Sequence, residues 1–248
     1  GYNFRKTHQL VIGARKVVKK DYIYLQSVHT KQNILNSLKS DSELVALAHP
    51  TIRHSYKPKF MSRLSGYDLI EVYSRHHYAG PLWDMALSAG HPIWGLGSED
   101  VHNVNNPTEA GNVWNMVHAK SKDPESVYEA LRTGRSYLIR GQNGHSDLSL
   151  ESLEVHGDSL LLRLSKPAQI RFIGQEGIVR KSVLNSSQAS LKLEYNDTYI
   201  RTEIEDGQSI MVLNPVIRYD GTTLPFKTAE INWFLTLIYR ALFLTIPA

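Results

Sequence analysis

Hydrophobic positions in the first 145 residues alternate between short strand-like runs and stretches with helical spacing. The helix-like stretches cover 29–39, 58–64, 81–89 and 124–133, and Asp123, Pro124 and Gly134 supply start and stop signals for the last one. Short apolar strands that alternate with helices predict a parallel α/β sheet or barrel. The predicted strands are 8–14, 21–25, 44–48, 68–73, 92–97, 112–119 and 136–140.

From about residue 150 the pattern changes, because strand-like runs follow one another with only turns between them. Turn residues stand at His156-Gly157-Asp158, Lys166-Pro167 and Asp206-Gly207. Short strands at this spacing predict a small all-β sandwich. We therefore divide the chain into an α/β portion (1–145), a β-sandwich appendage (146–222) and a tail (223–248). The strands predicted in the appendage are 152–155, 159–164, 169–173, 179–183, 190–195, 199–203 and 209–213.

The stretch 231–248 is strongly apolar and predicts an apolar C-terminal helix. Three interpretations are open: the start of a membrane-spanning helix, an interfacial helix, or a helix packed on the sandwich. Apolar residues on every face favour the membrane anchor, although Arg240 near the centre opposes burial in lipid. Association with a membrane through 231–248 is thus one expectation, and the location is either cytoplasmic or membrane-anchored.

Composition narrows the chemistry. The 248 residues are 42% hydrophobic and 21% charged, as in an ordinary globular protein, so disordered and collagen-like classes are excluded. The absence of cysteine excludes thiolate nucleophiles, Cys-ligated zinc and iron–sulfur clusters. The net charge is +4, with most histidines in the first half, which suits an anionic substrate or a metal site. No dense basic stripe is present, so we expect no stable nucleic-acid complex.

Candidate metal ligands stand where parallel strands end. His49 follows the predicted strand 44–48, whereas Asp100 and His102 follow the predicted strand 92–97. In α/β folds the functional side chains gather at the carboxyl ends of strands. Carboxylate and imidazole together suit Zn, Mn or Fe. The alternative for His49 is a histidine whose hydrogen bonds are satisfied in the core.

Four segments occur in an order and spacing that resembles a known family. They are ALAHP (46–50), GYDLIEVYS (66–74), LWDMALSAGHPIWGLGSEDVH (82–102) and ESVYEALRTGRSYLIRG (125–141). Together they resemble the PHP (polymerase and histidinol phosphatase) superfamily of metal-dependent phosphoesterases. The segments IRFIGQEG (170–177) and LNPVIRYDG (213–221) are similar to a β-rich appendage of some bacterial two-domain members. The resemblance implies a distorted, TIM-like (β/α)7 barrel, incomplete here, with two or three divalent metal ions at its mouth.

The resemblance also implies roles for individual residues. His49 matches the histidine of the internal His-Pro motif, and Asp100 and His102 match the late Asp-x-His motif. His8 resembles the histidine that follows the family's glutamate ligand. The opening His-x-His, the Thr-Asp-His motif and that glutamate are absent; we expect them upstream of Gly1, and we expect the present piece to be nearly inactive.

Two further residues are candidates around this site. Arg135 could bind a substrate phosphate, or it could be a cation that stabilises the end of the preceding helix. Glu71 lies inside a predicted strand, where a carboxylate is costly unless paired. It could hold a metal ligand through a hydrogen bond, or form a simple salt bridge.

The function that follows is hydrolysis of a phosphate ester by a metal-activated water. The expected substrate is a nucleotide, an oligonucleotide or a small phosphomonoester. The alternative is a catalytically degenerate PHP-like module that binds or scaffolds, tethered to a membrane by its tail.

Overall fold

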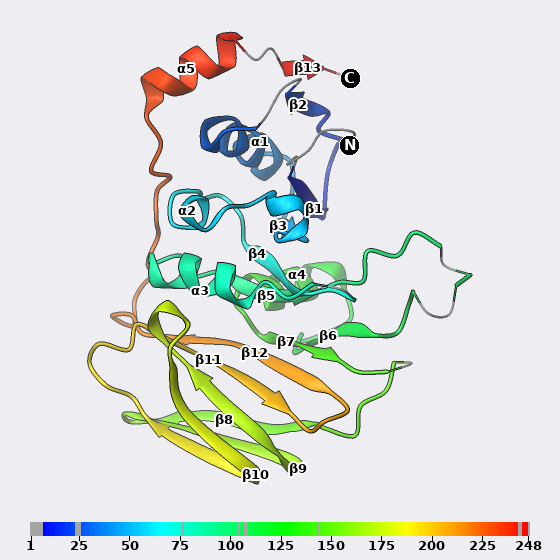
Figure 1. Cartoon of the computed structure of the whole chain (residues 1–248), viewed down its shortest axis with the longest axis vertical. Coiled ribbons are helices and arrows are strands. Elements are labelled where there is room, and N and C mark those ends of the chain that lie inside the picture. The colour runs from blue at the N-terminus through cyan, green and yellow to red at the C-terminus, as the bar shows by residue number, and fades with distance from the viewer. Residues whose placement is uncertain are drawn as a thin grey trace.

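The computed structural model describes residues 7–22, 26–75, 77–103, 105–106, 109–142, 144–242 and 245–247. A small sheet with its helices lies above a large antiparallel sheet (Figure 1). The small sheet has the order β1-β3-β4-β5, in which β3, β4 and β5 are parallel and β1 is antiparallel to β3. Its strands are β1 (His8–Ile12), β3 (Leu44–Ala48), β4 (Leu69–Tyr73) and β5 (Trp94–Gly97).

Short helices connect these strands. The helix α1 (Val28–Lys39) precedes β3, α2 (Pro58–Met61) links β3 to β4, and α3 (Gly80–Ser88) links β4 to β5. A single 3-10 turn, η1 (Ile52–His54), precedes α2. The apolar runs of β3, β4 and β5 are buried on both faces, as expected for parallel strands under helices.

The large sheet has seven strands in the order β10-β9-β11-β12-β7-β6, with β8 also paired to β9. Every pairing within it is antiparallel. The helix α4 (Pro124–Arg132) connects β6 to β7, and η2 (Gln175–Gly177) lies between β9 and β10. The strands are β6 (Val113–Val117), β7 (Ser136–Arg140), β8 (Leu150–His156), β9 (Ser159–Ile173), β10 (Val179–Lys192), β11 (Tyr199–Glu205) and β12 (Ile210–Ile217).

The expected TIM-like (β/α)7 barrel is therefore wrong. Parallel pairing stops at β5, since β6 and β7 form an antiparallel pair on either side of α4 and join the large sheet. The separate small sandwich is wrong as well, because strands before and after residue 145 belong to one continuous sheet. The short, alternating runs of residues 112–140 resemble another β/α repeat, but β6 pairs antiparallel with β7, and β7 pairs with β12, about seventy residues away.

Side-chain amides take the place of a strand beside β5. The backbone N–H of Gly97 donates to Asn115 Oδ1 (2.8 Å), and Asn115 Nδ2 donates back to the Gly97 carbonyl (2.8 Å). The N–H of Gly95 donates to Asn214 Oδ1 (2.6 Å), while Asn214 Nδ2 donates to the Ser136 carbonyl (2.8 Å). These bonds satisfy buried backbone groups that a barrel would satisfy with its next strand.

The expected turn at Lys166-Pro167 does not form, and β9 and β10 are single long strands where the sequence predicts two shorter ones each. Lys166-Pro167 lies inside β9, although proline lacks the N–H that a ladder requires. The partner strand has register shifts around Ser186, which pairs with Ala168, and Asn185 has a φ of 50°. This irregularity opposite Pro167 lets the strand continue past the proline.

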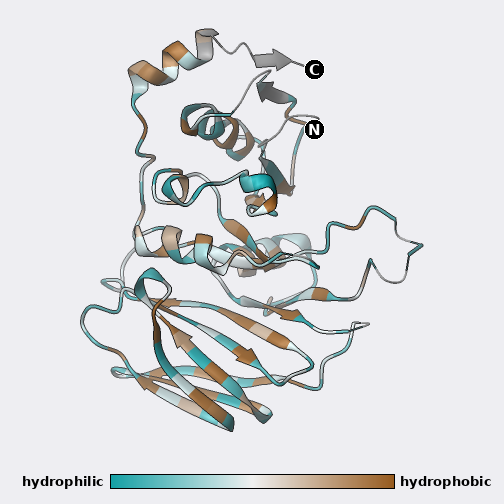
Figure 2. Ribbon diagram, in the orientation of Figure 1, coloured by the Kyte–Doolittle hydropathy of each residue, from teal (hydrophilic) through white to brown (hydrophobic). Residues whose placement is uncertain are grey.

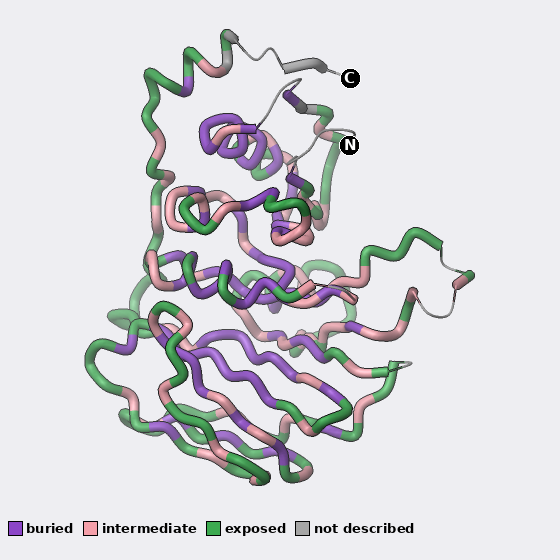
Figure 3. Tube along the Cα trace, viewed as in Figure 1, coloured by how far each residue is buried: buried purple, intermediate pink, exposed green. Residues whose placement is uncertain are grey.

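Buried apolar residues form two main cores. Figure 2 colours the chain by hydropathy and Figure 3 by burial. One core lies between the small sheet and its helices and includes Leu35, Leu47, Ile70 and Trp83. The other lies in the curve of the large sheet, around Phe172. Figure 3 shows the central strands of both sheets as buried.

A buried ionic cluster joins α3 to the large sheet. The Arg201 guanidinium binds Asp84 through Nε–Oδ1 (2.6 Å) and Nη2–Oδ2 (2.7 Å). Its Nη1 also donates to Glu203 Oε1 (2.5 Å), and Tyr78 donates to the same carboxylate. Each of the three charged side chains is at most 5% exposed. The polar residues of this cluster thus lie where the two layers meet.

The C-terminal segment returns along the small sheet to α1 (Figure 1). It ends in α5 (Trp233–Leu242) and in β13 (Thr245–Pro247), which pairs with β2 (Lys20–Tyr22). The expected apolar helix over 231–248 is therefore wrong, because a strand follows a helix of only ten residues. In the described part of the chain, no helix combines the length and the apolar character needed to span a bilayer.

Candidate functional site

A cavity of about 570 Å³ opens where β3 and β5 end and β1 begins. The antiparallel register of β1 and β3 pairs His8 with Ala48, so the start of one strand adjoins the end of the other. Parallel pairing of β4 with β5 brings the loop after Gly97 to the same edge. Sheet geometry alone therefore brings His8, His49 and Asp100 to one cavity.

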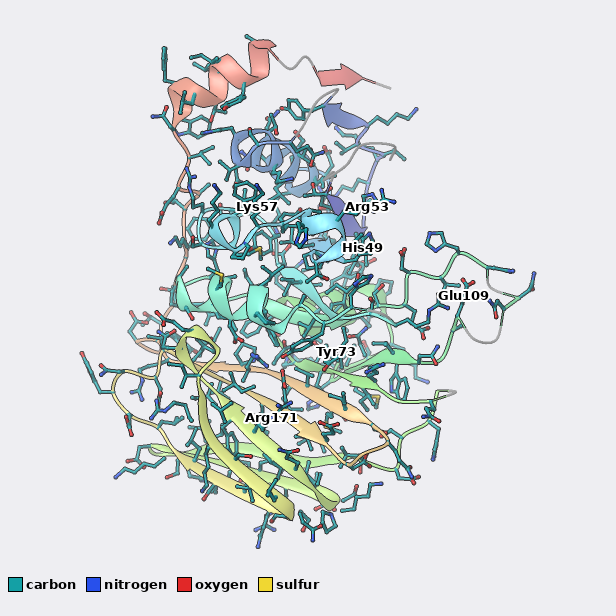
Figure 4. All side chains as sticks on the ribbon, viewed as in Figure 1. His49, Arg53, Lys57, Tyr73, Glu109 and Arg171 are labelled. Carbon is teal, nitrogen blue, oxygen red and sulfur yellow. The ribbon has the colours of Figure 1, made fainter. Side chains whose placement is uncertain are left out.

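Two imidazole rings converge in this cavity. His8 Nδ1 lies 2.7 Å from His49 Nε2, and the rings meet edge to face. Figure 4 labels His49 at the end of β3. A proton on one of these two nitrogens forms a hydrogen bond to the other, and when neither nitrogen is protonated their two lone pairs face a position that one cation could occupy.

Glu71 lies behind His49, on β4, and is 3% exposed. Its Oε2 accepts the backbone N–H of His49 (3.0 Å) and lies 3.7 Å from His49 Nδ1. Within the described residues, neither His49 Nδ1 nor Glu71 Oε1 has a hydrogen-bond partner. A small shift of the imidazole would join these groups, so the carboxylate is placed to orient the ring.

The electrostatic environment distinguishes the two histidines. The Glu71 carboxylate raises the pKa of His49 against the opposing effect of burial, and Asp100 adds to the increase. Burial lowers the pKa of His8, and the neighbouring His49 lowers it further, whereas Asp100 opposes both effects. The Asp100 carboxylate thus acts to raise the pKa of both rings, as expected for a negative charge near two imidazoles.

Strained backbone occurs at both strand ends of the site. His49 has a φ of 29° and Asp100 a φ of 51°, in the region that disfavours side chains with a Cβ. Such conformations cost about 1–3 kcal/mol each and persist where surrounding contacts determine them. The hydrogen bond from His49 N–H to Glu71 is one such contact.

Glu99 also lines the cavity, although it is not among the residues that the sequence pattern predicts for the site. Its carboxylate accepts the backbone N–H groups of Gly111 (2.9 Å), Asn112 and Val113 (3.0 Å). It therefore fixes the return of the loop 98–112 to β6. No local sequence signal marks this role, because the three donors lie more than ten residues away.

The structure separates the remaining candidates from this group. His102 is exposed, its Nδ1 lies 2.7 Å from the Asp100 carbonyl, and it is not part of the cavity lining. Arg135 lies after α4, where its Nε donates to Thr133 Oγ1 (3.1 Å), also outside the lining. Across the described ranges, no group of three or more His, Asp or Glu side chains forms a metal-binding cluster.

No protein-family model, no curated protein and no solved structure matches this chain. The geometry of the cavity is therefore the basis for any assignment of function. It offers two converging nitrogens, an adjacent carboxylate and a buried carboxylate that can orient one ring. This set can bind a cation, or can exchange protons with a bound ligand.

Proposed function

We propose that the cavity belongs to a site for metal-dependent hydrolysis of phosphate esters. The observation that supports this most directly is the convergence of His8 Nδ1 and His49 Nε2, with Asp100 lining the same cavity. The resemblance of residues 46–50 and 82–102 to PHP-superfamily segments agrees with a metal at this position.

The donor types fit a divalent cation such as Zn²⁺, Mn²⁺ or Fe²⁺. His8 and His49 would hold it, with Asp100 as a third ligand after rotation of its side chain. The unpartnered pair of His49 Nδ1 and Glu71 Oε1 fits as well, since ligating histidines commonly donate their second N–H to a carboxylate. When bound, the metal lowers the pKa of a coordinated water and neutralises charge on the phosphoryl group.

The chain's own residues supply the remaining functions. With the small shift of the ring described above, Glu71 would hold the His49 tautomer with a proton on Nδ1, which leaves the Nε2 lone pair facing the cavity. Glu99 fixes the loop that carries Asp100 through its three backbone hydrogen bonds. His49 and Asp100 both line the cavity from backbone conformations outside the strand region.

Metal binding tests this proposal on the present chain. We expect Zn²⁺ or Mn²⁺ titration by calorimetry to show a site that weakens at least tenfold in His49→Ala and in His8→Ala. His156→Ala is the matched control, because that histidine is exposed, pairs with Glu154 and does not line the cavity. Glu71→Gln should weaken binding less than either ligand variant.

Hydrolysis of p-nitrophenyl phosphate is then measured on the same samples. We expect turnover to be slow, because only two nitrogens converge in the cavity. It should require the added metal and fall at least tenfold in His49→Ala. Equal metal binding by the control and the ligand variants would contradict the metal site. Metal binding that never supports turnover would favour the alternative, a degenerate module that binds ligands without hydrolysis.

A further inference from the structure

A second cleft, of about 710 Å³, lies beside the cavity and opens between the end of β7 and the β11–β12 turn. Arg140, Gln142 and Gln208 contribute exposed polar side chains to its walls. Arg75 contributes a second guanidinium from the segment that follows β4. The cleft therefore combines a residue that follows β4 with residues in or next to the neighbouring strands β6, β7, β11 and β12 of the large sheet.

The cleft and the cavity share a wall. Asn112 lines the cleft and Val113 lines the cavity, and both donate their N–H groups to Glu99. The register of the large sheet pairs Val113 with Arg140, which places this arginine at the boundary between the two spaces. The two spaces therefore lie on either side of the segment that contains Asn112 and Val113.

The position of Arg140 is fixed by its neighbours. It pairs with Ile210 on one side and Val113 on the other, so its backbone is held between β12 and β6. Its guanidinium carbon lies 5.9 Å from the centre of the Tyr73 ring. Figure 4 labels Tyr73 between the two sheets. A guanidinium held over an aromatic ring keeps the N–H groups at the edge of its own plane available for an anion.

The opposite wall is a tight turn with little side-chain bulk. Asp206 Oδ1 accepts the N–H groups of Gln208 (3.0 Å) and Ser209 (2.7 Å), and Gly207 has a φ of 85°. A Cβ added at Gly207 would meet no atom within 4 Å, so this wall is open to a ligand. Two carboxylates weaken the attraction of the cleft for an anion. Glu205 lines the cleft and would repel the anion, and Glu109 interacts with the positive charge of Arg75.

We propose that this cleft binds a second anionic group of the ligand, a phosphate or a carboxylate, chiefly through Arg140. Guanidinium groups bind both oxyanions through paired N–H donors. The proposal deepens the proposed function, on which it rests, because it restricts the substrates to phosphate esters that carry another anion. The adjoining cavity would hold the ester to be cleaved, and the cleft would hold the remote anion.

The test uses chain that has been freed of metal with EDTA and then dialysed into chelator-free buffer, so its outcome is independent of the metal site and EDTA does not compete as an anion. Inorganic phosphate and succinate are titrated separately by calorimetry, and the tighter of the two identifies the preferred anion. We expect Arg140→Gln to weaken binding at least fivefold. The matched control is Arg163→Gln, since Arg163 is an exposed arginine of β9 outside the cleft, and it should leave binding unchanged.

A gain-of-binding variant guards against misfolding as the explanation. Glu205→Gln removes a carboxylate from the cleft and should tighten anion binding about two- to threefold, more at low salt than at high salt. Equal affinity in Arg140→Gln and Arg163→Gln would overturn the proposal, as would a Glu205→Gln variant that binds no more tightly. Anion binding by the metal-free chain together with failed metal binding would overturn the proposed function and leave the cleft as an anion site.

Discussion

Removal of Arg201 is expected to destabilise the chain more than removal of any exposed arginine. Its guanidinium makes three charge-assisted hydrogen bonds of 2.5–2.7 Å, to Asp84 and Glu203. All three side chains are at most 5% exposed, so Arg201→Met leaves two carboxylates buried beside an apolar side chain. Breaking one partner of a buried ion pair costs about 3–5 kcal/mol.

Urea unfolding followed by circular dichroism measures this cost. With a slope of about 3 kcal/mol/M, the midpoint should fall by roughly 1–2 M in Arg201→Met. Arg132→Met is the matched control, because Arg132 is 39% exposed in its ion pairs with Glu43 and Glu129. Exposed pairs contribute less than about 1 kcal/mol, so this variant should shift the midpoint by a few tenths of a molar at most.

A double variant separates the ion pair from simple loss of packing. In Asp84→Leu/Arg201→Met the buried aspartate is removed together with the arginine, and Arg171 still binds Glu203 at 2.8 Å. The double variant should therefore be more stable than Arg201→Met alone. The reasoning fails if Arg201→Met loses no more stability than Arg132→Met, or if the two single losses simply add in the double variant.

Three further predictions concern stability. Burial lowers the pKa of His91 to about 4, aided by a nearby lysine, so the free energy of unfolding should fall by up to about 3 kcal/mol between pH 7 and pH 4. The reason is that the His91 ring is protonated more readily in the unfolded chain than in the folded chain. In His91→Phe, the free energy of unfolding from urea titrations should therefore depend less on pH between 7 and 4. Asn214→Leu leaves the Gly95 N–H without its acceptor and should cost about 1–3 kcal/mol in the same assay. Asp123→Ala removes the side-chain cap of α4 and should cost about 1 kcal/mol, whereas an unchanged midpoint would exclude a capping role.

Local signals in the sequence were sufficient to predict the bounds of several helices and strands. Asp123 and Pro124 mark the start of α4, and the apolar runs of β3 and β7 have the predicted bounds. These features depend on capping, on proline geometry and on runs of buried residues, which act over a few positions. The location of His49 after β3 follows from the same kind of information.

Features that depend on distant residues could not be predicted in this way. The amides of Asn115 and Asn214 end the parallel sheet at β5, yet nothing in their local sequence marks them as substitutes for a strand. The dipeptide Lys166-Pro167 resembles a turn in the sequence, and only the irregular pairing of the partner strand allows it to be part of β9. In the site, Asp100 joins the two histidines, whereas Asp-x-His spacing alone did not place His102 in the cavity.

The position of β7 in the large sheet has a consequence for synthesis of the chain on the ribosome. Ile139 pairs with Met211, so one edge of β7 has no strand partner until about seventy further residues have been made. At about 5–20 residues per second this interval lasts roughly 4–14 s. An apolar strand with an open edge can pair with another nascent chain during that time. Slower translation between residues 140 and 211 should therefore lower the yield of folded protein, and faster translation or a holding chaperone should raise it.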